Sequence, residues 1–228
     1  MSEFSPSRRE IRVPTRGRSL SAVVLEALEA MVIDGTLPAG SRINIEGLAR
    51  EMEVSATPIR EALAKLESTR LVESRQPGYF VAPMLTGPEF HSMYDMRLLL
   101  EPWAAARAAE ITDDAGRARL RRELQAGGEE APESGQWDAY LRVSTHDHRF
   151  HDLIAELSCN SWLQEALRRM NIHVHLLRIY WKGQMGTHAL SEHQRICDAI
   201  CTGEGPTASE AMRNHLISSR ERIGKAFL

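Results

Sequence analysis

The 228-residue sequence predicts a mostly α-helical protein in two parts, a small N-terminal unit of three helices and a hairpin and a larger all-α C-terminal bundle. Apolar residues recur at helical spacing along most of the chain, whereas strand-like patterning is confined to residues 71–82. The change of character falls in the proline-containing stretch 83–88. We therefore expect a basic flexible arm over 1–18, one domain over 19–84 and a second over 85–228.

Within residues 19–84 the pattern predicts the layout of a winged helix-turn-helix. The first helix spans 19–33, the second about 45–51, and the third starts with Thr57 as its cap and Pro58 in the first turn, where the missing N–H of proline costs nothing. Hairpin strands over 71–74 and 79–82 follow. The residues expected to be buried in the three helices are Leu20, Val23, Val24, Ala27, Leu28, Met31 and Val32, then Leu48, Ala49 and Met52, then Ile59, Ala62, Leu63 and Leu66.

From residue 86 onward helical periodicity dominates, with breaks expected at 109–112, 127–135, 158–161, 182–188 and 203–206. These breaks divide the second domain into about six helices, which we expect to pack as an all-α bundle.

Composition excludes several classes of protein. The sequence has no 18-residue apolar stretch that could span a membrane, and the Arg-rich residues 1–18 lack the apolar core of a secretory signal. Three cysteines are too few for a disulfide framework, so we expect a cytoplasmic protein. The net charge of −3 does not favour nucleic acid by itself, and the arginines of the arm either reach phosphates or are simply solvated.

The most specific motif spans residues 48–67 and reads LAREMEVSATPIREALAKLE. It resembles the helix-turn-helix of the GntR family of bacterial regulators, whose pattern is L-A-x-x-x-x-V-S-R-T-P-V-R-E-A-L-x-x-L-E. Residues 35–43, 71–72 and 78–81 resemble the flanking parts of the same domain. The resemblance implies a transcription regulator that binds double-stranded DNA.

In such a domain the third helix points its first turn at a DNA groove. Thr57 can donate to a phosphate, and the guanidinium of Arg60 has the geometry to bind a guanine edge, although a solvated helix charge is the alternative for Arg60. Gly78 at the tip of the wing allows close backbone approach. The residues expected to contact DNA are Arg42, Ser55, Thr57, Pro58, Arg60, Lys65, Arg70 and Gly78.

Two positions depart from the family pattern. Ala56 replaces the usual arginine, which removes one expected contact and puts the usual operator sequence in doubt. Arg70 replaces the usual glycine, and it either continues the helix a little or adds a phosphate contact. Because one helix-turn-helix makes few contacts, we expect a homodimer that reads an inverted repeat, with the helical domain supplying much of the interface.

A second resemblance covers most of residues 88–216. Asp147, Phe150 and His151, followed by Ser158 and Asn160, resemble the D-x-x-F-H…S-x-N signature of the ligand-binding FCD domain of FadR-type GntR regulators. Further matches lie at 97–101, 192–200 and 211–216. The resemblance implies an FCD-like all-α bundle with a pocket for a small organic acid and, in many members, a divalent metal in that pocket.

The spacing of four residues supports a metal on its own terms. Asp147 and His151 are four positions apart and share one helix face, while His193 and His215 come from two later helices. Three imidazoles and one carboxylate suit Zn²⁺, with Ni²⁺ or Mn²⁺ also possible, and such a site can leave positions open for water or an effector carboxylate. The alternative is that each histidine is an ordinary core or surface residue.

The remaining histidines lack that support. We expect His146 and His148 to point to other faces than Asp147, and His173, His175 and His188 to lie at the surface or in the pocket wall.

Two pairs of residues have competing interpretations. Cys197 and Cys201 are interpreted as small buried hydrophobes, although a cysteine-containing metal site stays open. Arg97 and Arg178 are candidates for binding the effector's carboxylate, with a helix-surface salt bridge as the alternative for each.

The leading hypothesis is an effector-responsive DNA-binding regulator that is not an enzyme. One alternative is a sensor for which the metal itself is the signal. The other is a metalloenzyme, since three histidines and an aspartate can activate water, but no nucleophile motif or general base accompanies them.

Overall fold

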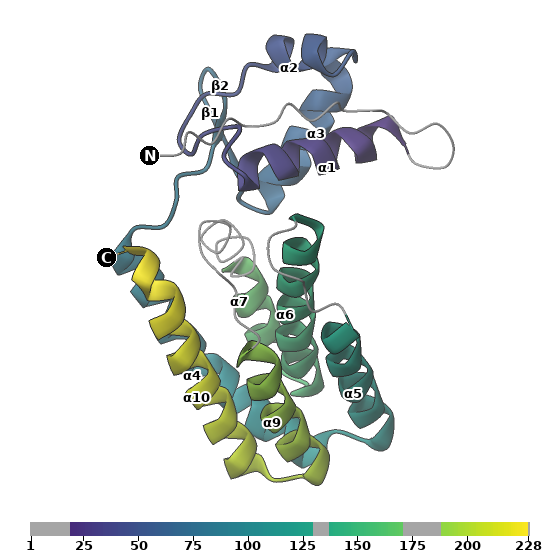
Figure 1. The fold of residues 1–228 in the computed structure, drawn as a ribbon, viewed down its shortest axis with the longest axis vertical. Helices are drawn as coiled ribbons and strands as arrows, with labels where there is room; N and C mark the ends of the chain where they lie inside the picture. Colours follow the sequence, from purple (N-terminus) through teal and green to yellow (C-terminus); the bar gives the residue numbers. More distant parts are fainter. Residues whose placement is uncertain (1–18, 130–136, 171–187, 228) are drawn as a thin grey trace. The chain divides into compact units, whose positions relative to one another are not determined.

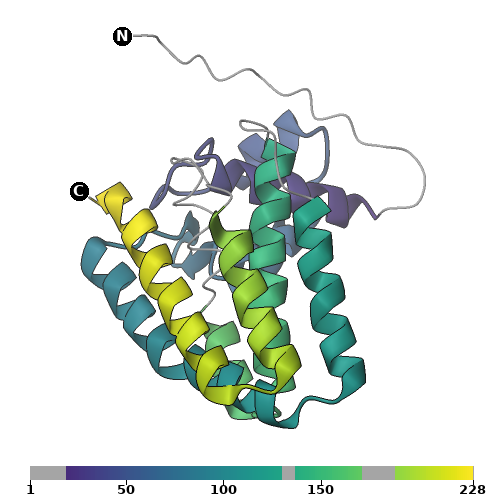
Figure 2. The same ribbon diagram turned by 60° about the horizontal axis from the view of Figure 1, so that its bottom comes forward.

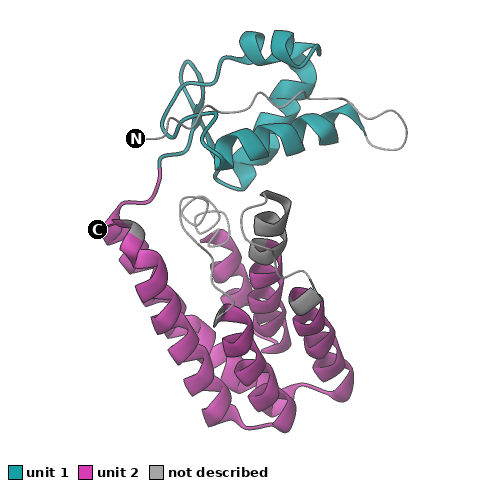
Figure 3. Ribbon diagram, viewed as in Figure 1, with its two compact units in different colours: residues 1–83 teal, residues 84–228 magenta. Residues whose placement is uncertain are grey.

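The computed structural model describes residues 19–129, 137–170 and 188–227. The chain divides into two compact units between Pro83 and Met84 (Figure 3). The first unit is a winged helix-turn-helix and the second an all-helical bundle, so the fold class predicted from the sequence is confirmed. No helix within the described ranges combines the length and apolar character needed to cross a bilayer.

The first unit has the predicted three helices and hairpin (Figure 1). Its elements are α1 (Leu20–Ile33), α2 (Ile45–Glu51), α3 (Ala56–Ser68), β1 (Val72–Arg75) and β2 (Gly78–Val81). The strands are antiparallel, and residues 40–43 run along the other edge of β2, where Ile43 N donates to Tyr79 O over 2.9 Å. The inward faces predicted for α2 and α3 are buried, as are Val24, Leu28 and Val32 of α1. The expectation for Leu20 is wrong, because at the first position of α1 it is 43% exposed, and the rest of the predicted stripe is half-buried.

Both ends of α3 differ from the sequence-based expectation. Ser55, not Thr57, is the N-cap, and its hydroxyl makes no capping hydrogen bond. The helix ends at Ser68, and Arg70 has a φ of 57° instead of continuing it. This left-handed conformation favours glycine because a Cβ crowds the following carbonyl, which accounts for the glycine that the family pattern has here.

The second unit is a bundle in which α4 and α10 lie side by side (Figures 1 and 2). Its elements are α4 (Gly87–Ile111), α5 (Asp114–Glu129), α6 (Trp137–Leu157), α7 (Ser161–Arg169), α9 (His188–Thr202) and α10 (Gly205–Gly224), with a final 3-10 turn at Lys225–Phe227. Thr86 and Glu89 form a capping box that starts α4. Aromatic and aliphatic side chains fill the core, among them Phe90, Tyr94, Phe150, Ile154 and Ile196.

The expected breaks near 109–112, 158–161 and 203–206 coincide with helix ends. The break expected over 127–135 starts later than predicted, because α5 continues through Gly127 to Glu129, and residues 130–136 lie outside the described residues. The break expected at 182–188 lies almost wholly outside the described residues.

Candidate metal centre and DNA-reading helix

Three helices of the second unit bring the four predicted ligands together. Asp147 and His151 come from α6, His193 from α9 and His215 from α10, and one ligand atom of each lies within 4.8 Å of the others. His151 Nε2 is 3.2 Å from His215 Nε2, and Asp147 Oδ1 is 3.5 Å from His193 Nε2 and 3.8 Å from His151 Nε2. The packing of the bundle therefore brings together residues that lie up to 68 positions apart in the sequence.

These distances fit a shared cation. Two ligands bound to one Zn²⁺ at about 2.1 Å lie about 3.4 Å apart at the tetrahedral angle. The separations of 3.2, 3.5 and 3.8 Å lie on both sides of that value. The most distant pair of ligand atoms, which lie within 4.8 Å of each other, would have to move closer on binding. The Nε2 atom of His193 is buried and has no hydrogen-bond partner among the described residues, an arrangement that costs free energy unless the lone pair is used.

Protonation also favours ligand binding. Burial lowers the pKa of His193 to about 3 and lowers the pKa of His215. Burial alone would raise the pKa of Asp147, but His193 and His151 hold it well below its ordinary value. At neutral pH the site therefore presents imidazole lone pairs and a carboxylate, which are the forms that bind metal ions.

Carboxylates hold the outer nitrogens of two of the imidazoles. Glu101 of α4 lies 2.5 Å from His151 Nδ1 and accepts a 2.6 Å hydrogen bond from Arg97 Nε. Burial raises the pKa of Glu101, but Arg97 and His151 outweigh it and lower the value to about 2. A carboxylate on the far nitrogen of a ligating histidine fixes the tautomer and the ring orientation.

His215 has an equivalent support. Glu192 of α9 lies 2.8 Å from His215 Nδ1 and accepts two hydrogen bonds, of 2.7 and 2.8 Å, from the guanidinium of Arg222 on α10. The ring of His215 is thus fixed by a bidentate ion pair that also joins α9 to α10.

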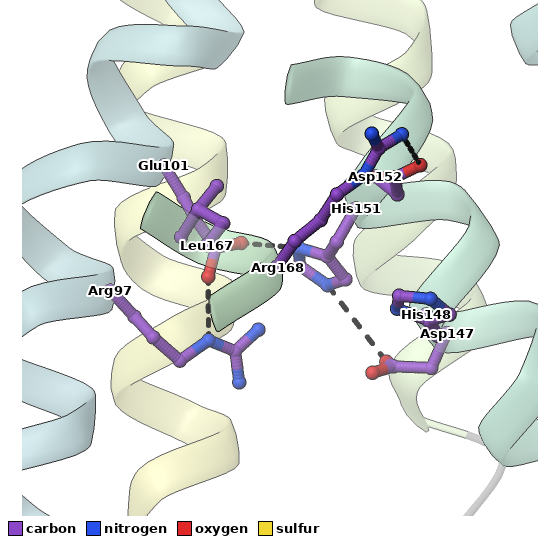
Figure 4. Close-up of a pocket in the computed structure, with 8 residues that line it drawn as sticks. All are labelled: Arg97, Glu101, Asp147, His148, His151, Asp152, Leu167 and Arg168. Atoms are coloured by element: carbon purple, nitrogen blue, oxygen red, sulfur yellow. Dashed lines mark hydrogen bonds and ion pairs between the residues drawn. The ribbon is translucent and has the colours of Figure 1, made fainter. Parts of the chain in front are cut away.

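A small cavity of about 40 Å³ opens beside Asp147 and His151, enough for a few water molecules or one small carboxylate. Figure 4 shows Arg97 and Glu101 on one wall, with the guanidinium of Arg97 directed across the cavity toward Asp147. The side chain of Arg97 is only 2% exposed, so its ion pair with Glu101 is buried and is not a surface salt bridge. The cavity is lined by Arg97, Glu101, Asp147, His148, His151, Asp152, Leu167 and Arg168. Arg178, the other predicted clamp, lies outside the described residues, as do His173 and His175.

Sequence reasoning missed four residues of this site. His146 is buried and its Nε2 lies 3.5 Å from His193 Nδ1, so it contacts a candidate ligand, which the sequence did not predict. His148 lines the cavity. Glu101 and Glu192 lie within the motifs that resemble the FCD domain, but nothing in their spacing assigned them to the histidines. Cys197 is buried and Cys201 half-buried, as the interpretation as small hydrophobes expects, and their sulfurs are 3.9 Å apart.

In the first unit, α3 presents polar side chains on its outer face. Thr57, Arg60 and Lys65 are exposed there, as is Ser55 just before the helix. Pro58 is buried, so its part is packing and not DNA contact.

The wing differs slightly from expectation. Gly78 is paired within β2 opposite Arg75, so the turn at the tip is Gln76-Pro77. Arg42 lies along this hairpin, and its Nη2 donates to Pro77 O over 3.4 Å. Arg42 and Arg70 are both exposed and cationic, and both stay predicted DNA contacts.

Comparisons with known proteins agree with this architecture. Residues 20–81 match the gntR family of bacterial regulatory proteins, and residues 92–218 match the FCD domain. The chain therefore belongs to the FCD-domain regulators of the GntR family. It is a DNA-binding transcription regulator and not an enzyme.

Individual relatives cover most of the chain. It is 28% identical to the uncharacterized regulator YdhC of Bacillus subtilis over 193 residues, which is 84% of this chain and 83% of YdhC. It is 26% identical to the regulator LutR of the same organism, over 86% of this chain and 98% of LutR. Among solved structures, Escherichia coli McbR/YncC superposes with a TM-score of 0.70 at 19% identity, over 93% of this chain and all of that one, and shows the same fold.

Proposed function

We propose that this regulator changes its affinity for DNA when a small organic acid docks at a divalent metal held by Asp147, His151, His193 and His215. The observation that carries the proposal is the convergence of these four ligand atoms within 4.8 Å, next to a cavity that a buried arginine lines. Three nitrogens and one oxygen favour Zn²⁺, with Ni²⁺ and Mn²⁺ as alternatives. The ion, when bound, would supply a Lewis-acidic position for a carboxylate oxygen.

The cavity favours an anionic ligand of small size. Arg97 uses Nε to bind Glu101, and Figure 4 shows the remaining end of its guanidinium facing the cavity. A planar guanidinium can bind a carboxylate with two parallel hydrogen bonds. Two relatives are named for operons of hydroxy acids, the putative L-lactate dehydrogenase operon regulator of Escherichia coli and the gluconate operon repressor of Bacillus subtilis. These names support a carboxylate as the effector here.

We also propose that the protein is a homodimer and binds an inverted repeat. An apolar stripe on α4 is exposed to solvent. It consists of Met96, Leu99 and Trp103, which are 44%, 70% and 48% exposed. These positions are spaced by three and four residues, so they share one face of α4. When the same stripe of a second copy covers this one, the two chains form a two-fold interface. A two-fold dimer has two recognition helices, one for each half of a palindrome.

The test measures operator affinity in four conditions. A DNA fragment selected from a random pool is titrated by fluorescence anisotropy at fixed salt, with chelator-treated or Zn²⁺-loaded protein, each with and without L-lactate or gluconate. An effector-responsive regulator shows a carboxylate effect only when metal is present. A metal sensor shows a change with Zn²⁺ alone. Identical affinity under all four conditions, confirmed over a wider panel of organic acids, would contradict the proposal.

A further inference from the structure

The imidazole of His193 is held differently from the other two. In the part of the chain that the structure describes, no carboxylate reaches its outer nitrogen, and the neighbour at Nδ1 is Nε2 of His146, 3.5 Å away. Phe150 stacks on the ring, with centroids 4.3 Å apart and planes inclined by 16°. His146 Nδ1 in turn lies 3.2 Å from Glu123 Oε1 of α5, and Glu123 is paired with Arg149.

This chain of contacts has a consistent direction of hydrogen bonding. If Nε2 of His193 presents its lone pair to a cation beside Asp147, its proton lies on Nδ1. That N–H then needs an acceptor, and Nε2 of His146 is the neighbour placed to accept. His146 must carry its own proton on Nδ1, from which it donates to the carboxylate of Glu123. Glu123 thus acts on His193 through an intervening imidazole.

The backbone of α5 makes room for the intervening ring. Gly127 lies inside α5, where glycine destabilises a helix by roughly 1 kcal/mol relative to alanine. A Cβ at this position would lie 2.3–2.4 Å from three ring atoms of His146, far inside van der Waals contact. The buried glycine therefore admits the imidazole of His146 between α5 and α9.

We propose that His146 is a positioning residue for the metal centre, which holds His193 in the Nδ1-protonated tautomer and aims its Nε2 at the ion. This proposal rests on the proposed function, because it takes His193 to be a ligand of the metal ion. The tautomer is that of the metal-bound protein, because without a cation Nε2 of His193 faces the carboxylate of Asp147 at 3.5 Å. The separation of 3.5 Å is long for a hydrogen bond, so the contact is expected to shorten when His193 binds the ion.

Two variants of His146 separate hydrogen bonding from packing. His146→Phe keeps a ring of similar size but has no acceptor for His193 Nδ1–H. His146→Gln can accept that hydrogen bond through its amide oxygen and donate to Glu123 through its amide nitrogen. Gly127→Ala is a third variant, because it displaces the His146 ring without altering any ligand. His91→Phe is the matched control, since His91 is exposed on α4 and bonded to Arg220.

The experiment uses the full chain and Zn²⁺ alone as the probe. Zn²⁺ dissociation constants are measured by competition with a chromophoric chelator, and imidazole tautomers of the Zn²⁺-loaded protein by long-range ¹H–¹⁵N correlation spectra. We expect the dissociation constant to rise roughly 10- to 100-fold for His146→Phe and Gly127→Ala, as for other outer-shell partners of metal-bound histidines. His146→Gln should recover most of that loss, and His91→Phe should bind like the parent protein. The spectra should show both His193 and His146 protonated at Nδ1.

Each result decides between the two proposals. Unchanged Zn²⁺ affinity in His146→Phe, or a His146 protonated at Nε2 in the Zn²⁺-loaded protein, would overturn the role of His146 while the metal site stands. A parent protein that binds no Zn²⁺ would overturn the metal site, and the role of His146 with it.

Discussion

Glu101→Gln is the substitution whose cost the structure defines best. Glu101 is 3% exposed and holds two partners, Arg97 at 2.6 Å and His151 at 2.5 Å. A neutral amide leaves the buried guanidinium of Arg97 without its hydrogen-bonded carboxylate partner. Removing one partner of a buried ion pair typically costs about 3–5 kcal/mol.

The electrostatics of the site give a similar figure. Arg97 and His151 lower the pKa of Glu101 from an ordinary 4.5 to about 2, so the site prefers the charged over the neutral form by roughly 3 kcal/mol. Glutamine resembles the neutral form in shape and charge. We therefore expect Glu101→Gln to lower the free energy of unfolding of the second unit by about 3 kcal/mol.

The assay is urea denaturation with chelator present, followed by tryptophan fluorescence. All four tryptophans lie beyond residue 84, so the signal reports the second unit. Glu110→Gln is the matched control, because its pair with Arg107 is on the same helix but about half exposed, and it should cost less than about 1 kcal/mol. Adding Arg97→Met to Glu101→Gln should restore part of the loss. A loss below about 1 kcal/mol for Glu101→Gln would refute the reasoning.

Three further predictions concern DNA binding, the stability of α3 and assembly. Arg60→Ala should weaken operator binding by roughly 1–3 kcal/mol and relax discrimination at one base pair in an anisotropy titration, and unchanged base preference would remove Arg60 from the readout. Arg70→Gly relieves a positive φ, so amide exchange in α3 should slow about fivefold, for a gain of roughly 1 kcal/mol, whereas faster exchange would show that the backbone there is unstrained. Leu99→Asp should convert a dimer to a monomer in light scattering, and a persistent dimer would place the interface elsewhere.

Periodicity and motif were sufficient for most of the architecture. The buried faces of α2 and α3 follow from 3.6-residue spacing, and the four candidate ligands were identified because they match a signature spread over three helices. Local features were less predictable. Thr57 was misassigned as the cap, and Arg70 does not continue the helix as one alternative had it, because helix ends depend on backbone dihedral angles that residue type only biases.

The residues that hold the candidate ligands in place could not be predicted, for a different reason. Glu123 and His146 meet across α5 and α6, a contact that no helical spacing encodes. Gly127 was interpreted as a helix break because glycine usually lowers helical stability, but here its small size admits the ring of His146. Contacts between helices depend on packing, which a single sequence does not specify.

The metal content of the protein tests the central claim most directly. The full chain is purified without chelator and without a histidine tag, and transition metals are quantified by mass spectrometry against protein concentration. The site geometry predicts close to one equivalent of Zn²⁺, Ni²⁺ or Mn²⁺ per chain, with a large reduction in His193→Ala. Less than about a tenth of an equivalent of any transition metal, with no rise in thermal stability when these ions are added, would contradict the account.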